Sequence, residues 1–129
     1  MSKKIAEFYN DDLSSWVHSI VFYLDEILNL EHRLEGIIRR NNIVDIAAKV
    51  EVHQLMLDKI SGKLAELKSD VVKLQNDLNP DGIIISDDLI NESMQLKMKL
   101  LTYNFAQLEK EYIDVKYFCN SFLTEMLKK

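Results

Sequence analysis

The chain has 129 residues with one Pro, three Gly, one Cys, 47% hydrophobic and 29% charged residues, a composition that describes one soluble domain of ordinary size. Acidic residues outnumber basic residues by 21 to 16, so the net charge is −5. This sign opposes binding to the phosphate backbone of nucleic acids, and we expect no nucleic-acid partner.

Two further features bear on the compartment. Cys119 is the only cysteine and cannot form an internal disulfide, which favours a cytoplasmic protein. The longest uninterrupted apolar run extends from Ile20 to Leu24, far below the roughly 18 to 20 residues of a membrane span, and the first residues lack the apolar core of a signal peptide. We therefore expect neither a membrane partner nor export.

Helix-breaking residues occur at two places, Asn41–Asn42 and Asn79–Gly82, and they divide the chain into three segments. The first predicted helix runs from near Asp12 to about Arg40, and the second from near Asp45 to about Leu78. The third begins at Ser86 or Asp87 and continues to the C-terminus. An N-terminal arm of about ten residues precedes the first helix or extends it.

Apolar residues recur at alternating steps of four and three in each segment, the spacing of helices packed along their length. The second stripe is Ile46, Val50, His53, Leu57, Ile60, Leu64, Leu67, Val71, Leu74 and Leu78. The third is Met94, Met98, Leu101, Phe105, Leu108, Tyr112, Val115, Cys119, Phe122 and Met126. The first is wider and is centred on Ile20, Ile27 and Leu34.

Short connections force consecutive long helices to be antiparallel neighbours. The predicted fold is therefore all-α, a single-domain up-down-up three-helix bundle of long coiled-coil-like helices with a short N-terminal arm. In plan it resembles spectrin-like repeats, with Trp16 near the start of the first helix. This resemblance covers the architecture and that one residue, and it implies no function.

Two predicted stripes each contain one conspicuous polar residue, Glu31 in the first and His53 in the second. If the chain folds back at Asn41–Asn42 and near residue 82, Glu31 lies level with His53, and His53 lies level with Tyr112. We expect these three residues to form a polar layer that fixes the helix register. A ligand or proton-handling site is the alternative, because a carboxylate that orients an imidazole also builds a general base or a metal ligand. No nucleophile lies at this level, and we expect no catalysis.

The connection from Asp77 to Asp88 resembles the calcium loop of the EF-hand. Oxygen-bearing side chains occupy positions one, three and five, Gly82 occupies position six, and a carboxylate occupies position twelve. Asp88 stands where that family has a bidentate Glu, and Pro80 is unusual inside the loop. The alternative is an ordinary connection, in which residues 79–82 form a turn and Ser86, Asp87 or Asp88 caps the third helix. We expect this alternative, with weak cation binding or none.

Charge is distributed unevenly along the predicted bundle. Residues 70–92 contain six acidic residues and Lys73 alone as a base. The opposite pole contains six basic residues, namely Arg33, Arg39, Arg40, Lys49, Lys128 and Lys129, against three acidic ones. Charged helix ends are usually only solvated, and we expect this here. The alternative is contact with an acidic partner or contact between the ends of two copies.

Outward positions of a solvated helix should be polar, yet those of the third helix include Leu96, Tyr103 and Tyr117, and the first helix places Phe22 outward. The predicted register places Phe22 level with Asn104 and therefore beside Tyr103. We expect these four apolar residues to form an interface for a homodimer or for another protein. The alternative is a monomer in which the N-terminal arm covers them.

No phosphate-cradling Gly-rich loop, metal-spaced Cys/His set or catalytic triad order is present in the sequence. We therefore expect a non-enzymatic protein without a cofactor that acts through protein contacts as a scaffold, adaptor or subunit. The alternative class is a helical bundle that binds a ligand or a divalent cation, through either the polar layer or the loop.

Overall fold

The computed structural model describes residues 3–40 and 44–128 and contains three long helices. They are α1 (Ile5–Arg40), α2 (Val44–Leu78) and α3 (Glu92–Leu127). Two single-turn 3₁₀ helices, η1 (Pro80–Gly82) and η2 (Asp87–Leu89), lie in the connection between α2 and α3. The predicted break at Asn41–Asn42 lies outside the described residues.

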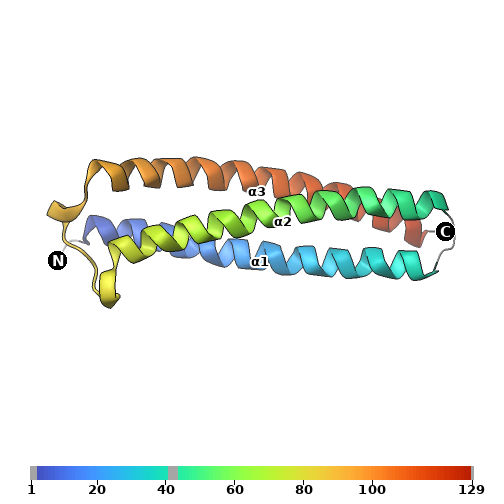
Figure 1. Ribbon diagram of the computed structural model, residues 1–129, viewed down its shortest axis with the longest axis horizontal. Helices are drawn as coiled ribbons and strands as arrows, with labels where there is room; N and C mark the ends of the chain where they lie inside the picture. The colour runs from blue at the N-terminus through green and yellow to red at the C-terminus, as the bar shows by residue number, and fades with distance from the viewer. Residues whose placement is uncertain (1–2, 41–43, 129) are drawn as a thin grey trace.

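The helices form one elongated bundle in which α1 and α3 run in the same direction and α2 runs in the opposite direction (Figure 1). The start of α1 and the connection between α2 and α3 lie at one end, and the C-terminus lies at the other. The predicted all-α, up-down-up three-helix bundle is confirmed. Its helices are 35 or 36 residues long, which corresponds to about 53 Å of helix.

The core follows the heptad spacing of the sequence. Nine of the ten residues in the predicted α2 stripe are buried, and Ile46 is half-buried at its end. In α1 the buried residues continue one heptad apart toward the N-terminus, from Leu34 through Ile27 and Ile20 to Leu13 and Ala6. The expected N-terminal arm is therefore helical from Ile5 onward, because burial of Leu13 and Ala6 compensates the loss of chain entropy.

The connection between α2 and α3 is longer than the sequence predicts. Leu78 ends α2, and the turn that follows places Asp81 and Gly82 at positive φ angles of 54° and 80°, which Gly tolerates best. The third helix then begins at Glu92 rather than at Ser86 or Asp87. Its N-cap is Asn91, whose side chain accepts a hydrogen bond of 2.8 Å from the Met94 backbone N–H.

Asp87 caps a helix other than the predicted one. Its Oδ1 accepts a hydrogen bond of 2.8 Å from the backbone N–H of Ile5, the first residue of α1. This N–H has no acceptor within its own helix, so a carboxylate from a distant part of the chain satisfies it. The connection therefore joins the start of α1 to the α2–α3 end of the bundle.

The longer connection changes which residues of α2 and α3 are level. A fold at residue 82 places Lys63 level with Thr102, whereas the structure pairs Lys63 with Glu111, nine positions further along, at 3.0 Å. Asp77 and Lys97 give the same register, with 3.9 Å between their charged atoms. The predicted alignment of α3 is therefore wrong by more than two helical turns.

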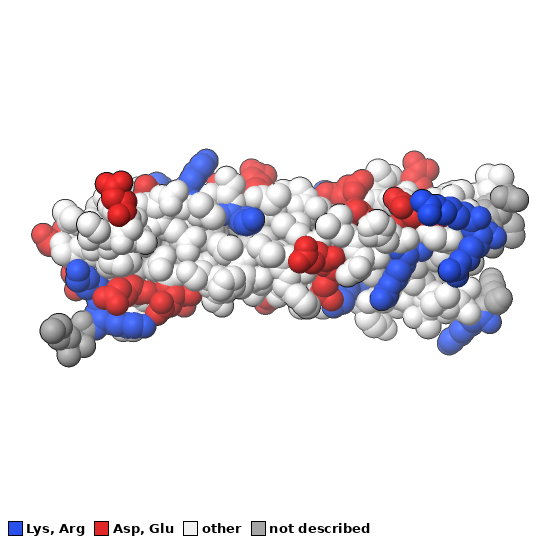
Figure 2. All heavy atoms as spheres, turned by 90° about the horizontal axis from the view of Figure 1, so that it is seen from below, with Lys and Arg blue, Asp and Glu red and all other residues white. Residues whose placement is uncertain are grey.

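The predicted charge asymmetry follows the bundle axis. In Figure 2 blue Lys and Arg side chains gather at the end that includes the end of α1, whereas both colours occur at the other end. The bond between Ile5 and Asp87 brings Lys3 and Lys4 to the acidic end, where Lys3 pairs with Asp11. Lys129 of the predicted basic pole lies outside the described residues. None of the described helices contains a stretch long and apolar enough to cross a bilayer.

Replacing Asp87 by Ala should reduce the free energy of unfolding by about 1 kcal/mol, because the Ile5 N–H loses its carboxylate acceptor. Urea denaturation followed by circular dichroism measures the change. Asp88→Ala is the matched control, since the Asp88 carboxylate accepts from Ser86 within the connection. Equal losses in both variants would contradict the capping role of Asp87.

Candidate functional site

The three residues of the predicted polar layer, Glu31, His53 and Tyr112, have contacts in three different places. Tyr112 donates a hydrogen bond to Glu26 of α1. His53 packs against two rings of α3, and Glu31 lies beside Asp58 of α2. The expected contacts among them do not form in this register, because α3 is displaced along α2 and Glu31 faces Asp58 instead of His53.

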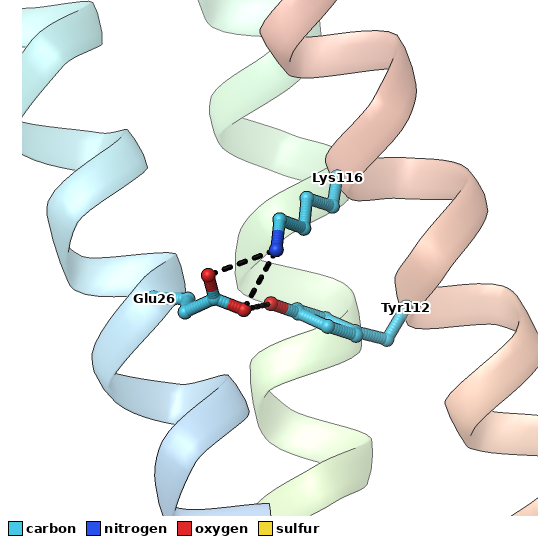
Figure 3. Close-up of polar contacts among 3 residues, drawn as sticks. All are labelled: Glu26, Tyr112 and Lys116. Atoms are coloured by element: carbon cyan, nitrogen blue, oxygen red, sulfur yellow. Dashed lines mark hydrogen bonds and ion pairs between the residues drawn. The ribbon is translucent and has the colours of Figure 1, made fainter.

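The most extensive polar cluster joins α1 and α3 around Glu26 (Figure 3). Lys116 Nζ lies 2.9 Å and 2.8 Å from the two carboxylate oxygens of Glu26, and the Tyr112 hydroxyl donates to Oε1 of the same carboxylate. Tyr112 is 2% exposed, while the Lys116 side chain reaches the surface and is 36% exposed. One carboxylate therefore satisfies a buried hydroxyl and a partly exposed cation together.

A second tyrosine extends the cluster along α1. The Tyr23 ring stacks on the Tyr112 ring with 4.3 Å between centroids, and the Tyr23 hydroxyl donates a 2.5 Å hydrogen bond to Glu109. Each tyrosine hydroxyl thus meets one carboxylate from the other helix. The two pairs fix how α1 and α3 lie against each other at this level.

Burial and these neighbours shift the protonation equilibria of the cluster. Burial and then the Glu109 carboxylate raise the pKa of Tyr23 to about 12, and burial and Glu26 raise the pKa of Tyr112 further still. Burial alone would raise the pKa of Glu26, but the hydrogen bonds from Lys116 and Tyr112 and the Lys116 charge together hold it below its usual value. At neutral pH both tyrosines are protonated donors and Glu26 is ionised, so the cluster holds no free base.

Sequence reasoning missed Glu26, Lys116 and Glu109. A local signal was present, because Tyr112 and Lys116 are four residues apart and share one face of α3. Nothing local identifies their partner on α1, since that depends on how far α3 is displaced along the bundle.

His53 lies in an aromatic environment. Its ring centroid is 4.6 Å from those of Phe118 and Phe122, and the residue is 5% exposed. Burial lowers the pKa of His53. The imidazole therefore serves as a flat, neutral core side chain at neutral pH.

Glu31 and Asp58 form a contact between two acidic side chains. Burial, the hydrogen bond with Asp58, and then the charges of Asp58 and Glu35 raise the pKa of Glu31. This pair is electrostatically unfavourable when both groups are ionised.

The carboxylates of the calcium-loop resemblance point to separate partners. At loop positions one and twelve, Asp77 pairs with Lys97 and Asp88 accepts from Ser86. Asp87, which is not a ligand position of the resemblance, accepts from Ile5. Asn79 Oδ1 is buried without a hydrogen-bond partner in the described part of the chain. Within residues 3–40 and 44–128, no three His, Cys, Asp or Glu side chains are arranged to hold one metal ion.

The four predicted interface residues are all exposed, with Phe22 and Leu96 each 58% exposed, Tyr103 63% and Tyr117 75%. The predicted adjacency of Phe22 and Tyr103 is wrong, again because of the register of α3. Phe22 instead lines a groove between α1 and α3 together with Ile113 and Tyr117, beside the Glu26 cluster. Two of the four predicted interface residues, Phe22 and Tyr117, therefore line one groove with Ile113.

Comparisons of the chain with protein-family models, with curated proteins and with solved structures found no match. The Glu26 cluster and the exposed side chains around it form the candidate site.

Replacing Glu26 by Gln should lower the free energy of unfolding by about 1 kcal/mol at pH 7, a modest loss because Lys116 is partly exposed. The pKa of Glu26 is lowered in the folded state. The carboxylate therefore contributes fully to folding stability above the unfolded-state pKa of about 4.3, and this stabilisation is lost as the pH falls through the folded-state pKa. The difference between wild type and variant should therefore shrink in acid. Glu111→Gln, in a more exposed pair with Lys63, is the control and should change little. A difference that grows below pH 4 would contradict the assigned role.

Replacing His53 by Leu should preserve the fold and raise stability at pH 5 relative to wild type. The folded-state pKa of His53 is lowered, so the unfolded chain takes up a proton that the folded chain excludes as the pH falls below about 6.5. Chemical denaturation at pH 7 and pH 5 measures this, with exposed His18→Leu as the control. An unfolded His53→Leu chain would mean that the imidazole makes an indispensable polar contact.

Proposed function

We propose that this chain is a non-enzymatic cytoplasmic protein that works by binding other proteins, as a scaffold, an adaptor or a subunit. The observation that carries the proposal is the cluster of exposed Phe22, Ile113 and Tyr117 around the groove between α1 and α3. All three are more than half exposed. Contiguous apolar patches of this kind mark binding surfaces more often than solvated ones, and Tyr and Phe are enriched at protein interfaces.

The polar groups beneath this patch favour protein contact over small-molecule binding. A ligand site needs polar side chains that are free to converge on the ligand. Here Glu26, Lys116 and Tyr112 satisfy one another, and the Tyr23 hydroxyl is bonded to Glu109. The surface therefore offers mainly aromatic and aliphatic area around a pre-paired polar group.

A second exposed stripe on α3 supports self-association. Leu96, Leu100 and Tyr103 are spaced by four and three residues, lie on one helix face and are each more than half exposed. Within this proposal, the predicted homodimer uses this stripe, and the groove beside Phe22 and Tyr117 receives a different protein.

Photo-crosslinking from single positions tests both contacts. The variants Tyr117→Cys, Tyr103→Cys and Leu55→Cys are labelled with a benzophenone maleimide and irradiated in a lysate of the source cells. Native Cys119 is buried, and burial raises the pKa of its thiol to about 11, so it reacts slowly with the label. We expect position 117 to yield an adduct with a different protein and position 103 an adduct with a second copy.

Leu55 on α2 is the control, because it is 61% exposed but belongs to neither surface. It should yield neither adduct. Absence of any protein adduct at both 103 and 117, or equal labelling from all three positions, would contradict the proposed function.

A further inference from the structure

The groove between α1 and α3 is long enough to hold a helix. One hollow, of about 740 Å³, is lined by Phe22, Tyr23 and Glu26 of α1 and by residues of α3 from Tyr112 onward. A second, of about 440 Å³, continues along α1 to Arg40, and both are lined by Asn120 and Thr124. Together they form one α1/α3 groove from Phe22 to Arg40, about 27 Å at 1.5 Å per residue.

The half of the α1/α3 groove near Phe22 is apolar and electrically balanced. Phe22, Ile113 and Tyr117 line it, and its Glu26 carboxylate is neutralised by Lys116 at 2.8 Å. A partner can bury apolar side chains there without leaving a buried charge unpaired, because the ion pair is already formed within the chain.

The half near Arg40 is cationic. Arg33 and Arg40 line it, and Lys128 lies on the α3 side of the adjoining hollow. Among residues 3–40 and 44–128, none of these three cations has an ion pair, and the remaining lining carboxylate is Glu125. In a chain with a net charge of −5, this concentration of unpaired positive charge lies at one end of an apolar groove.

We propose that the α1/α3 groove binds an acidic amphipathic helix of another protein, about 18 residues long. The apolar face of that helix packs against Phe22, Ile113 and Tyr117, and its carboxylates pair with Arg33 and Arg40. This is the helix-in-groove mode of recognition, with charge fixing the direction and register of the bound helix. The inference rests on the proposed function and specifies the chemistry of the partner.

A second copy of the chain fits the α1/α3 groove poorly. A two-fold contact of groove against groove brings the unpaired cations of both copies into one interface, where like charges repel. Two carboxylates at the acidic pole of a second copy are already engaged within their own chain, since Asp77 and Asp87 are bound to Lys97 and to the Ile5 N–H. The cationic half of the groove therefore selects a different, acidic chain.

Fluorescence anisotropy with two synthetic peptides tests the inference. Both are 18 residues long with Leu at the a and d heptad positions, and the other positions carry mainly Glu in one peptide and mainly Lys in the other. Each is labelled and titrated with the purified full-length chain. We expect the Glu peptide to bind at least about tenfold more tightly than the Lys peptide, and its affinity to fall as salt is raised.

Matched variants locate the binding site. Arg33→Glu combined with Arg40→Glu should lower the affinity for the Glu peptide at least about tenfold. Arg39→Glu should leave this affinity unchanged, because Arg39 lies at the same helix end but does not line the groove. Phe22→Ser should weaken it as well, and Leu28→Ser is the control, because Leu28 is 55% exposed on α1 but does not line the groove. Circular dichroism verifies that each variant is folded.

Equal affinity for the two peptides, or an affinity insensitive to the Arg33 and Arg40 changes, would overturn the inference. So would light scattering that shows a dimer of the wild-type chain and a monomer of Phe22→Ser, since the occupant would then be a second copy. Protein adducts from position 117 without binding of the Glu peptide reject this inference alone. Absence of protein adducts at both 117 and 103 rejects the proposed function itself.

Discussion

The path of the chain between Leu78 and Glu92 determines which side chains of the bundle meet. Ile85 N–H donates to the Leu78 carbonyl at 3.0 Å, Asp87 binds the start of α1, and Asn91 caps α3. These bonds hold both ends of the connection, so α3 begins at a fixed height. Because a helix rises about 1.5 Å per residue, the nine-residue displacement of α3 relative to the predicted register moves each of its side chains by more than two turns along the bundle. The Glu26 cluster and the His53 stack both result from this height.

Tyr112 illustrates how one buried polar group shapes the seam between α1 and α3. A buried hydroxyl without an acceptor costs about 1 to 3 kcal/mol, so the position requires a partner from a neighbouring helix. Glu26 supplies the acceptor, and Lys116 keeps that carboxylate ionised and partly solvated. The hydrogen bond holds α1 and α3 together at this level. Beyond it, toward Arg40, the two helices leave the hollow that forms the cationic half of the α1/α3 groove.

The sequence predicted the buried faces well because a helix face depends only on local spacing. The α2 stripe from Val50 to Leu78 is buried as its heptads require, and the same period in α1, extended back to Leu13 and Ala6, could have located the helix start. The site was less predictable because it depends on the relative height of separate helices. Asp87 fits the pattern of a local cap, and only its contact with Ile5 shows that it caps a helix 82 positions away in the chain.

The positive charges near the end of α1 have two different physical explanations. Arg39 and Arg40 lie in the last turn, where the partial negative charge of the helix C-terminus stabilises a cation, and this effect is largely confined to that turn. Arg33 lies seven residues before the end of α1, about two turns further in, so the helix dipole gives little reason for a cation there. It lines the hollow beside Asn120 and Leu123 of α3, without an ion pair among the described residues. Arg33 is explained neither by capping nor by an internal ion pair among the described residues. The proposed acidic partner would therefore account for it more directly than for the two terminal arginines.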